Sequence, residues 1–114
     1  MDVGTVHAYA DGFAVAVVAD DTDRISGYLS EELKGNIAEV LGGLPRSIRG
    51  AEVLSVTCPE DDECISVTRF SGFRGAAMLR ATWIEEQQQH QPVIRAAWIV
   101  DGKVKEGQGA ERAS

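Results

Sequence analysis

The sequence lacks any long apolar run, and it has few cysteines, few aromatic residues and few basic residues. No stretch approaches the roughly 20 apolar residues of a membrane-spanning helix, and the first residues lack the character of a signal peptide. Two cysteines in 114 residues are too few for a disulfide scaffold, so we expect a cytoplasmic location. With 11 basic against 18 acidic residues the net charge is −7, which argues against nucleic acid and anionic membranes as partners.

What is present fits one globular domain. Apolar residues make up 44% of the chain and charged residues 25%, which are ordinary values for a folded protein. A chain of 114 residues has no room for a second independent core. We expect the domain to span residues 1–106 and the polar tail 107–114 to be disordered.

The first half of the chain has the periodicity of helices. Residues 3–19 carry apolar side chains at helical spacing and end at four short polar residues, 20–23, which also suit the start of a short second helix. Ser30 is a suitable N-cap for a third helix, which has apolar residues at 33, 37, 40, 41 and 44 and is ended by two glycines and Pro45.

The second half of the chain has the composition of strands. Four segments rich in β-branched, aromatic and other apolar residues, 51–58, 64–70, 76–84 and 93–100, are separated by short polar or glycine-containing connections. Such short connections imply antiparallel hairpins. Helices first and strands after predict an α+β domain, with one long and two shorter helices packed on a mainly antiparallel sheet.

The last predicted hairpin decides which side chains share a face. We expect Trp83 to pair with Ile94; in that register Leu79 lies opposite Trp98, and both indole rings face the helices. The opposite face mixes apolar and charged residues, which indicates either a subunit interface or arginine stems lying over their neighbours with the charged ends in water. The interface candidates are Met78, Arg80, Ile84, Arg95 and Ile99.

The two cysteines flank a predicted hairpin tip. If the apolar residues of both strands share one face, Cys64 points away from Cys58 and a disulfide is excluded. We therefore expect two free thiols. The acidic residues 60–63 between them are solvated loop charges or a weak metal site, since they lack the ligand spacing of zinc and calcium sites.

The sequence contains no motif that specifies a reaction. It has no nucleophile elbow, no phosphate-binding loop and no dinucleotide fingerprint, so we expect no catalytic residue, no metal and no cofactor. His7 lies near the start of the first helix and His90 lies in a polar loop. Asp11, in the middle of the first helix, is expected to face water.

The layout resembles the nuclear transport factor two-like superfamily, the α+β cone shared with ketosteroid isomerases and SnoaL-like cyclases. The resemblance covers roughly residues 3–105 and rests on the helix that ends in ADDTD (19–23), the helix that ends at 28–29, the proline-bounded third helix and the strand that ends at 97–103. It implies a curved sheet of about four strands that wraps the long helix, an apolar pocket at the open end, and homodimers formed through the outer face of the sheet.

The same resemblance does not extend to the isomerase chemistry. Phe13 stands near the position of the tyrosine that donates to the oxyanion, and Asn36 or Ile37 stands near that of the general base. The second acid that would share the oxyanion falls on a strand around Trp83, where no acid is available before Glu85. The pocket that the resemblance implies is lined by Tyr9, Phe13, Tyr28, Arg69, Phe70, Trp83 and Trp98.

These observations predict a non-catalytic homodimer with a modest apolar pocket for a small hydrophobic or anionic ligand. One alternative is an enzyme of the cyclase, dehydratase or isomerase type that uses Asp11, Tyr28, His7 or Arg69. Another is a domain that binds a different protein through the outer sheet face. Residues 69–84 contain three arginines and no acid, and this positive segment in an acidic chain suits a carboxylate-bearing surface or a small anion.

Overall fold

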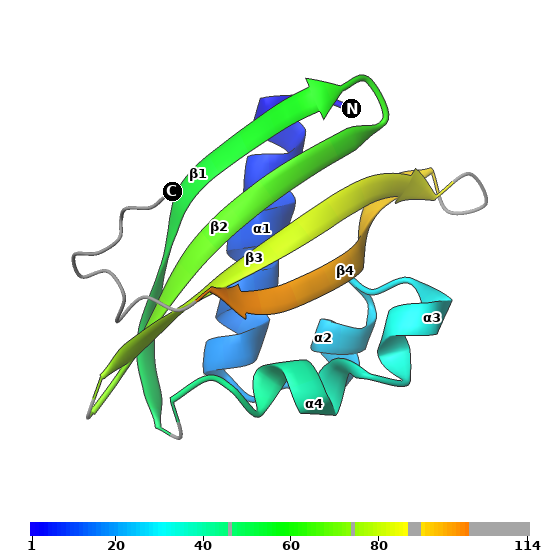
Figure 1. Cartoon of the computed structure of the whole chain (residues 1–114). Helices are drawn as coiled ribbons and strands as arrows, with labels where there is room; N and C mark the ends of the chain where they lie inside the picture. Colours follow the sequence, from blue (N-terminus) through cyan, green and yellow to red (C-terminus); the bar gives the residue numbers. More distant parts are fainter. Residues whose placement is uncertain (46, 74, 87–89, 101–114) are drawn as a thin grey trace.

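Four helices precede a four-stranded antiparallel sheet in the computed structural model, which describes residues 1–45, 47–73, 75–86 and 90–100 (Figure 1). The helices are α1 (Val3–Val18), α2 (Thr22–Ser26), α3 (Glu31–Lys34) and α4 (Ile37–Leu41). The strands are β1 (Ile48–Glu60), β2 (Glu63–Gly72), β3 (Ala76–Glu86) and β4 (Gln91–Val100), in the order β1-β2-β3-β4. The predicted α+β class and the antiparallel hairpins are confirmed. The predicted tail 107–114 lies outside the described residues.

Short polar residues stand at both ends of helix α1, and at its start one of them caps the free backbone amides. Asp2 is the N-cap, and its carboxylate accepts a hydrogen bond of 3.0 Å from the Thr5 amide. Asp20, just past the helix, has a left-handed backbone with φ 57°, and Asp21 caps α2 by accepting from the Arg24 amide. The prediction that residues 20–23 end one helix and start the next is confirmed.

The predicted third helix is two short helices. Ser30 caps α3 as expected, and its hydroxyl accepts from the Leu33 amide at 3.3 Å. The helix then stops at Gly35, and Asn36 starts α4 without a side-chain cap. The expectation of one continuous helix is wrong because glycine and asparagine are weak helix formers that interrupt an otherwise apolar stripe.

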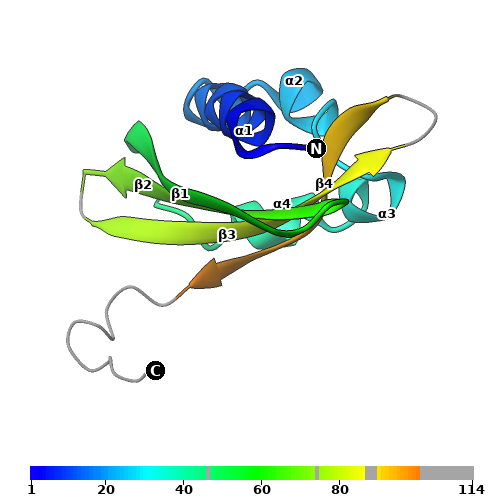
Figure 2. The same cartoon turned by 90° about the horizontal axis from the view of Figure 1, so that it is seen from above.

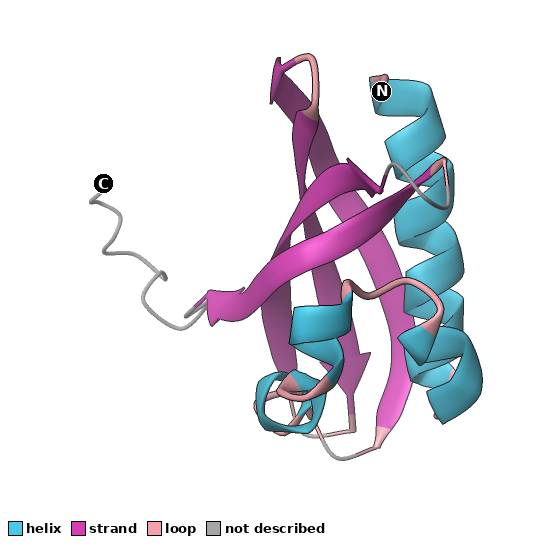
Figure 3. Cartoon of the chain, turned by 90° about the vertical axis from the view of Figure 1, so that its right-hand side faces the viewer, coloured by secondary structure: helices cyan, strands magenta, loops and turns pink. Residues whose placement is uncertain are grey.

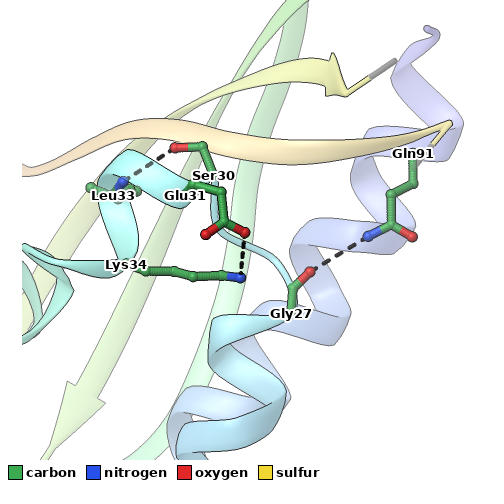
Figure 4. Close-up of polar contacts among 6 residues, drawn as sticks. All are labelled: Gly27, Ser30, Glu31, Leu33, Lys34 and Gln91. Atoms are coloured by element: carbon green, nitrogen blue, oxygen red, sulfur yellow. Dashed lines mark hydrogen bonds and ion pairs between the residues drawn. The ribbon is translucent and has the colours of Figure 1, made fainter. Parts of the chain in front are cut away.

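The segment between α2 and α3 is tied to β4. Leu29 forms an isolated parallel bridge with Ile94, whose amide donates to the Tyr28 carbonyl at 2.7 Å and whose carbonyl accepts from the Ser30 amide at 2.9 Å. The Gln91 side-chain amide, at the start of β4, donates to the Gly27 carbonyl at 3.5 Å (Figure 4). These bonds fix the short helices beside the end strand of the sheet.

The core lies between α1 and one face of the sheet (Figures 2 and 3). We call this face the inner face and the opposite one the outer face. The residues of α1 that it buries include Val6, Ala10, Phe13 and Val17, which recur at helical spacing. The largest fully buried side chains of the strands are Trp83, Phe70, Leu79, Ile94 and Val93.

Strand β2 buries the opposite side from the one expected. Cys64, Ser66, Thr68 and Phe70 are buried, whereas Ile65 and Val67 are only half-buried and Arg69 is exposed. The apolar residues of β1 and β2 therefore do not share one face as expected, because Val56 pairs with Ser66 and not with Ile65 or Val67. A strand has only two faces, and burying the first set keeps the Arg69 charge in water and the Phe70 ring out of it.

The register of the last hairpin also differs from the expected one. Trp83 pairs with Ile94 as predicted, but a shift follows at once, and Leu79 lies opposite Ile99 instead of Trp98. The extra residue is Arg95, which has no partner in β3. As a result Trp98 lies opposite Arg80, on the outer face, and the expectation that both indoles face the helices is wrong.

The two cysteines form a disulfide. Cys58 and Cys64 face each other across the β1–β2 hairpin with their Cα atoms 4.0 Å apart, so the prediction of two free thiols is wrong. The physical reason is the choice of face on β2, which turns Cys64 inward, together with a register shift between Thr57 and Glu60. The disulfide closes the end of the hairpin that lies over α1.

Candidate functional site

Four aromatic side chains occupy the space between α1, α2 and the sheet. Tyr28 is the centre of this aromatic cluster: its ring lies edge to face with Phe13 at 5.9 Å between centroids, with Tyr9 at 6.2 Å and with Trp83 at 6.5 Å. Edge-to-face packing at these distances is the favoured geometry of aromatic pairs. Gly12 permits it, because a Cβ at position 12 would overlap the Tyr28 hydroxyl.

The aromatic cluster is anchored by a buried hydrogen bond. The Trp83 indole Nε1 donates to the Ser66 hydroxyl at 2.9 Å, and both residues are buried. This bond satisfies the only polar group of the indole, which would otherwise lose its hydration without compensation. The cluster is therefore a packed part of the core.

The residues predicted to line one pocket lie on two different faces. Phe70 is fully buried on the inner face of the sheet, on the same side as the aromatic cluster. Arg69 is exposed on the outer face and forms an ion pair with Glu52 at 2.9 Å. Trp98 is 45% exposed, with the Arg80 guanidinium carbon 5.8 Å from its ring centroid. The structure thus brings Tyr9, Phe13, Tyr28 and Trp83 together and separates Arg69 and Trp98 from them.

Four surface grooves on the described part of the chain have volumes of about 330 to 470 Å³. Phe13, Tyr28, Phe70 and Trp83 are not among the lining residues of these four grooves. Tyr9 alone of the predicted pocket residues reaches one, a polar groove that also includes Asp2, Glu85 and His90.

The residues considered for catalysis do not converge on one point. His7 and Asp11 form an exposed pair on α1, with 3.2 Å between Nδ1 and Oδ2, as residues four apart on a helix commonly do. Tyr28 is held in the aromatic cluster and Arg69 is on the outer face. Among the described residues, no group of three or more side chains has the composition of a metal site.

The pKa shift that the structure explains belongs to Asp2, which lies in the polar groove beside Tyr9 and caps α1. The side-chain hydrogen bond from Thr5 lowers the pKa of the Asp2 carboxyl below 3.8. This carboxylate caps α1, and its role is structural.

The outer face carries most of the predicted interface residues. Directly paired residues form a row across it, and the row consists of Ser55, Val67, Arg80 and Trp98. Met78 and Ile84 are half-buried on the same face, and Arg95 is exposed at the register shift. Ile99 is the exception, because it packs against Gly43 and the core. Its assignment to the outer face is wrong, for the same one-residue shift that moved Trp98 outward.

Sequence reasoning missed an apolar groove at the far end of the sheet. It has a volume of about 470 Å³ and lies between the segment after α4 and the turn that joins β2 to β3. Phe73, in that turn, is 70% exposed. An aromatic residue between two glycines in a turn, Gly72 and Gly75, is the signal that could have indicated it.

Neither models of known protein families nor curated protein sequences give a match to this chain. None of the helices in the described ranges combines the length and the apolar character that crossing a bilayer requires.

Proposed function

We propose that this chain is a non-catalytic domain of the nuclear transport factor two-like type that forms a homodimer through the outer face of its sheet. A long capped helix, short helices joined to the end strand by the Leu29–Ile94 bridge, and a four-stranded antiparallel sheet packed on α1 support the likeness in fold. The packed aromatic cluster and the scattered acids and bases favour a role without catalysis.

The observation that carries the proposal is the exposure of a large aromatic side chain on a strand. Trp98 is 45% exposed on the outer face. Half-buried Val67, Met78 and Ile84 lie on the same face. Tryptophan, methionine and arginine are enriched at the centres of protein interfaces, and this face combines all three.

The outer face also has the charges that an interface needs for specificity. In the described part of the chain, Arg80 is paired with the Trp98 ring and not with a carboxylate, and Arg95 has no ion pair. Glu52 and Glu63 lie on the same face of the sheet. A two-fold arrangement that brings these arginines near the partner's carboxylates would compensate their charges.

Sedimentation equilibrium tests this proposal. The wild-type protein is expected to have twice the chain mass of 12.2 kDa, and Arg80→Glu or Trp98→Ser is expected to reduce the mass toward that of one chain. The control is Val15→Ser, which changes a side chain that is 55% exposed on α1 and should leave the mass unchanged. A monomeric wild-type protein would reject the homodimer and leave a different protein as the partner of this face.

The Cys58–Cys64 disulfide bears on the expected cytoplasmic location, which rested on two cysteines being too few for a disulfide scaffold. A disulfide is typical of proteins from oxidising compartments, so the cysteines do not support that expectation.

A further inference from the structure

The groove between the segment after α4 and the β2–β3 turn is closed at one end, where the two segments touch, and is lined by small side chains beyond that point. Gly72 touches the chain after α4, since a Cβ on it would lie 2.9 Å from the Ser47 carbonyl oxygen. The turn then closes through a 2.7 Å hydrogen bond from the Gly72 amide to the Gly75 carbonyl. Beyond this contact, glycine and alanine residues line the space between the two segments. The lining includes Gly43, Leu44, Pro45, Phe73, Ala76 and Ala77.

The surface of this groove is apolar at both its base and its rim. Leu44 is buried and belongs to the core, so it forms a fixed wall. Phe73 is 70% exposed at the rim, so most of this aromatic side chain is open to solvent. A volume of about 470 Å³ is within the range of small-molecule sites, which are concave and mainly apolar with a few polar groups.

A positive charge lies beside the rim. The Arg49 guanidinium carbon is 5.2 Å from the centroid of the Phe73 ring, in cation–π contact. Within the described ranges, Arg49 forms no ion pair with a carboxylate. The sequence from 69 to 84, which supplies the turn and one wall of the groove, contains no acidic residue. The local charge is therefore positive in a chain whose net charge is −7.

We propose that this groove binds a small aromatic anion, with its ring between Phe73 and the wall formed by Leu44 and Ala77 and its anionic group directed toward Arg49. An aromatic ring fits because it packs on the exposed Phe73 ring and covers apolar surface. A negative group fits because Arg49 has no carboxylate within ion-pair distance in the described part of the chain. The site is separate from the outer-face row, so this proposal goes beyond the homodimer and does not depend on it.

Fluorescence titration with two probes of similar shape tests the proposal. The anionic probe is 8-anilinonaphthalene-1-sulfonate, and the neutral probe is N-phenyl-1-naphthylamine. Phe73→Ser is expected to weaken the binding of both probes about tenfold, because it removes the ring that both would cover. Arg49→Gln is expected to weaken the anionic probe about threefold to fivefold and to leave the neutral probe unchanged.

Two controls keep the result specific to the groove. Val15→Ser alters a second apolar groove, between α1 and β1, and should change neither titration. All variants should unfold at the wild-type denaturant midpoint, which excludes probe binding to a loosened core. Ala77→Leu fills the groove from the opposite wall and should weaken both probes even if Phe73→Ser unfolds. Absence of binding by the wild type, or binding unaffected by the Phe73 and Ala77 changes, would overturn the proposal.

Discussion

The inner and outer faces of strand β2 are composed in the reverse of the usual way. The inner face buries Cys64, Ser66, Thr68 and Phe70, while Ile65 and Val67 lie on the outer face with Arg69. Counting apolar residues alone would favour burying the second set. Because side chains alternate along a strand, however, the whole segment turns one way or the other. Burying Ile65 and Val67 would place the Arg69 charge inside and the Phe70 ring outside.

The comparison teaches that small polar residues are buried readily when the surroundings provide partners. Ser66 accepts the indole hydrogen bond of Trp83, and Cys64 is covalently bonded to Cys58. The Arg69 guanidinium would not find such a partner on the inner face. Burying a charge without a partner costs far more free energy than burying a hydroxyl that is hydrogen-bonded. The side chain that costs the most free energy to bury decides which face of the strand turns to the core.

The largest expected difference between the two faces is the stability lost when a large side chain is truncated. Phe70→Ala on the inner face should reduce the free energy of unfolding by about 3–5 kcal/mol, since it leaves a cavity in a closed core. Val67→Ala on the outer face should reduce it by less than about 1.5 kcal/mol. Denaturant unfolding at one protein concentration measures both values. Equal losses would mean that the two faces are buried alike.

The disulfide is the next test of the inner face. Replacing Cys58 and Cys64 together by alanine should reduce the free energy of unfolding by about 2 kcal/mol, the loop-closure entropy of a short hairpin. Thr57→Ala, exposed beside Cys58, is the matched control. Thiol titration of the native protein prepared without reductant should find none free, and two reactive thiols would contradict the assignment.

The buried hydrogen bond should have a smaller effect. Ser66→Ala leaves the Trp83 Nε1 group without its acceptor and should reduce the free energy of unfolding by about 1.5 kcal/mol. Thr57→Ala, at an exposed position of β1 that is not part of the outer-face row, should have almost no effect. Combining Ser66→Ala with Trp83→Phe separates the hydrogen bond from the packing of the ring, and purely additive losses would show that the bond contributes nothing.

The smallest effect on stability is expected for an exposed hydrogen bond, the one that Asp2 accepts from Thr5. The hydrogen bond from Thr5 holds the pKa of Asp2 below 3.8, so its stabilisation is present above that value and is lost as the pH falls through the lower, folded-state pKa. Asp2→Asn keeps the cap but removes this titration. The difference in unfolding midpoint between the two proteins should therefore shrink on acidification, and a constant difference from pH 6 to pH 2 would contradict it.

Sequence reasoning located the elements better than it located the site. The caps at Ser30 and Asp21 were predictable, because a cap is a contact within one turn of the chain. The break at Gly35 was the missed local signal. The exposed position of Trp98 was not predictable, because it depends on one residue, Arg95, that has no partner in β3. The shift at Arg95 lies beside Ile94, which forms backbone hydrogen bonds with Tyr28 and Ser30, far away in the sequence.

The sequence by itself determined an α+β domain with an acidic surface, a helical first half and hairpins in the second half. Helical periodicity, capping residues and turn residues act over a few positions, and each is visible in the order of the residues. Only the tertiary structure decided that Cys58 meets Cys64, that Trp83 is buried while Trp98 faces outward, and that Phe73 stands at the rim of a groove. These features follow from which face each strand turns to α1, and one register shift reverses that choice for every residue beyond it.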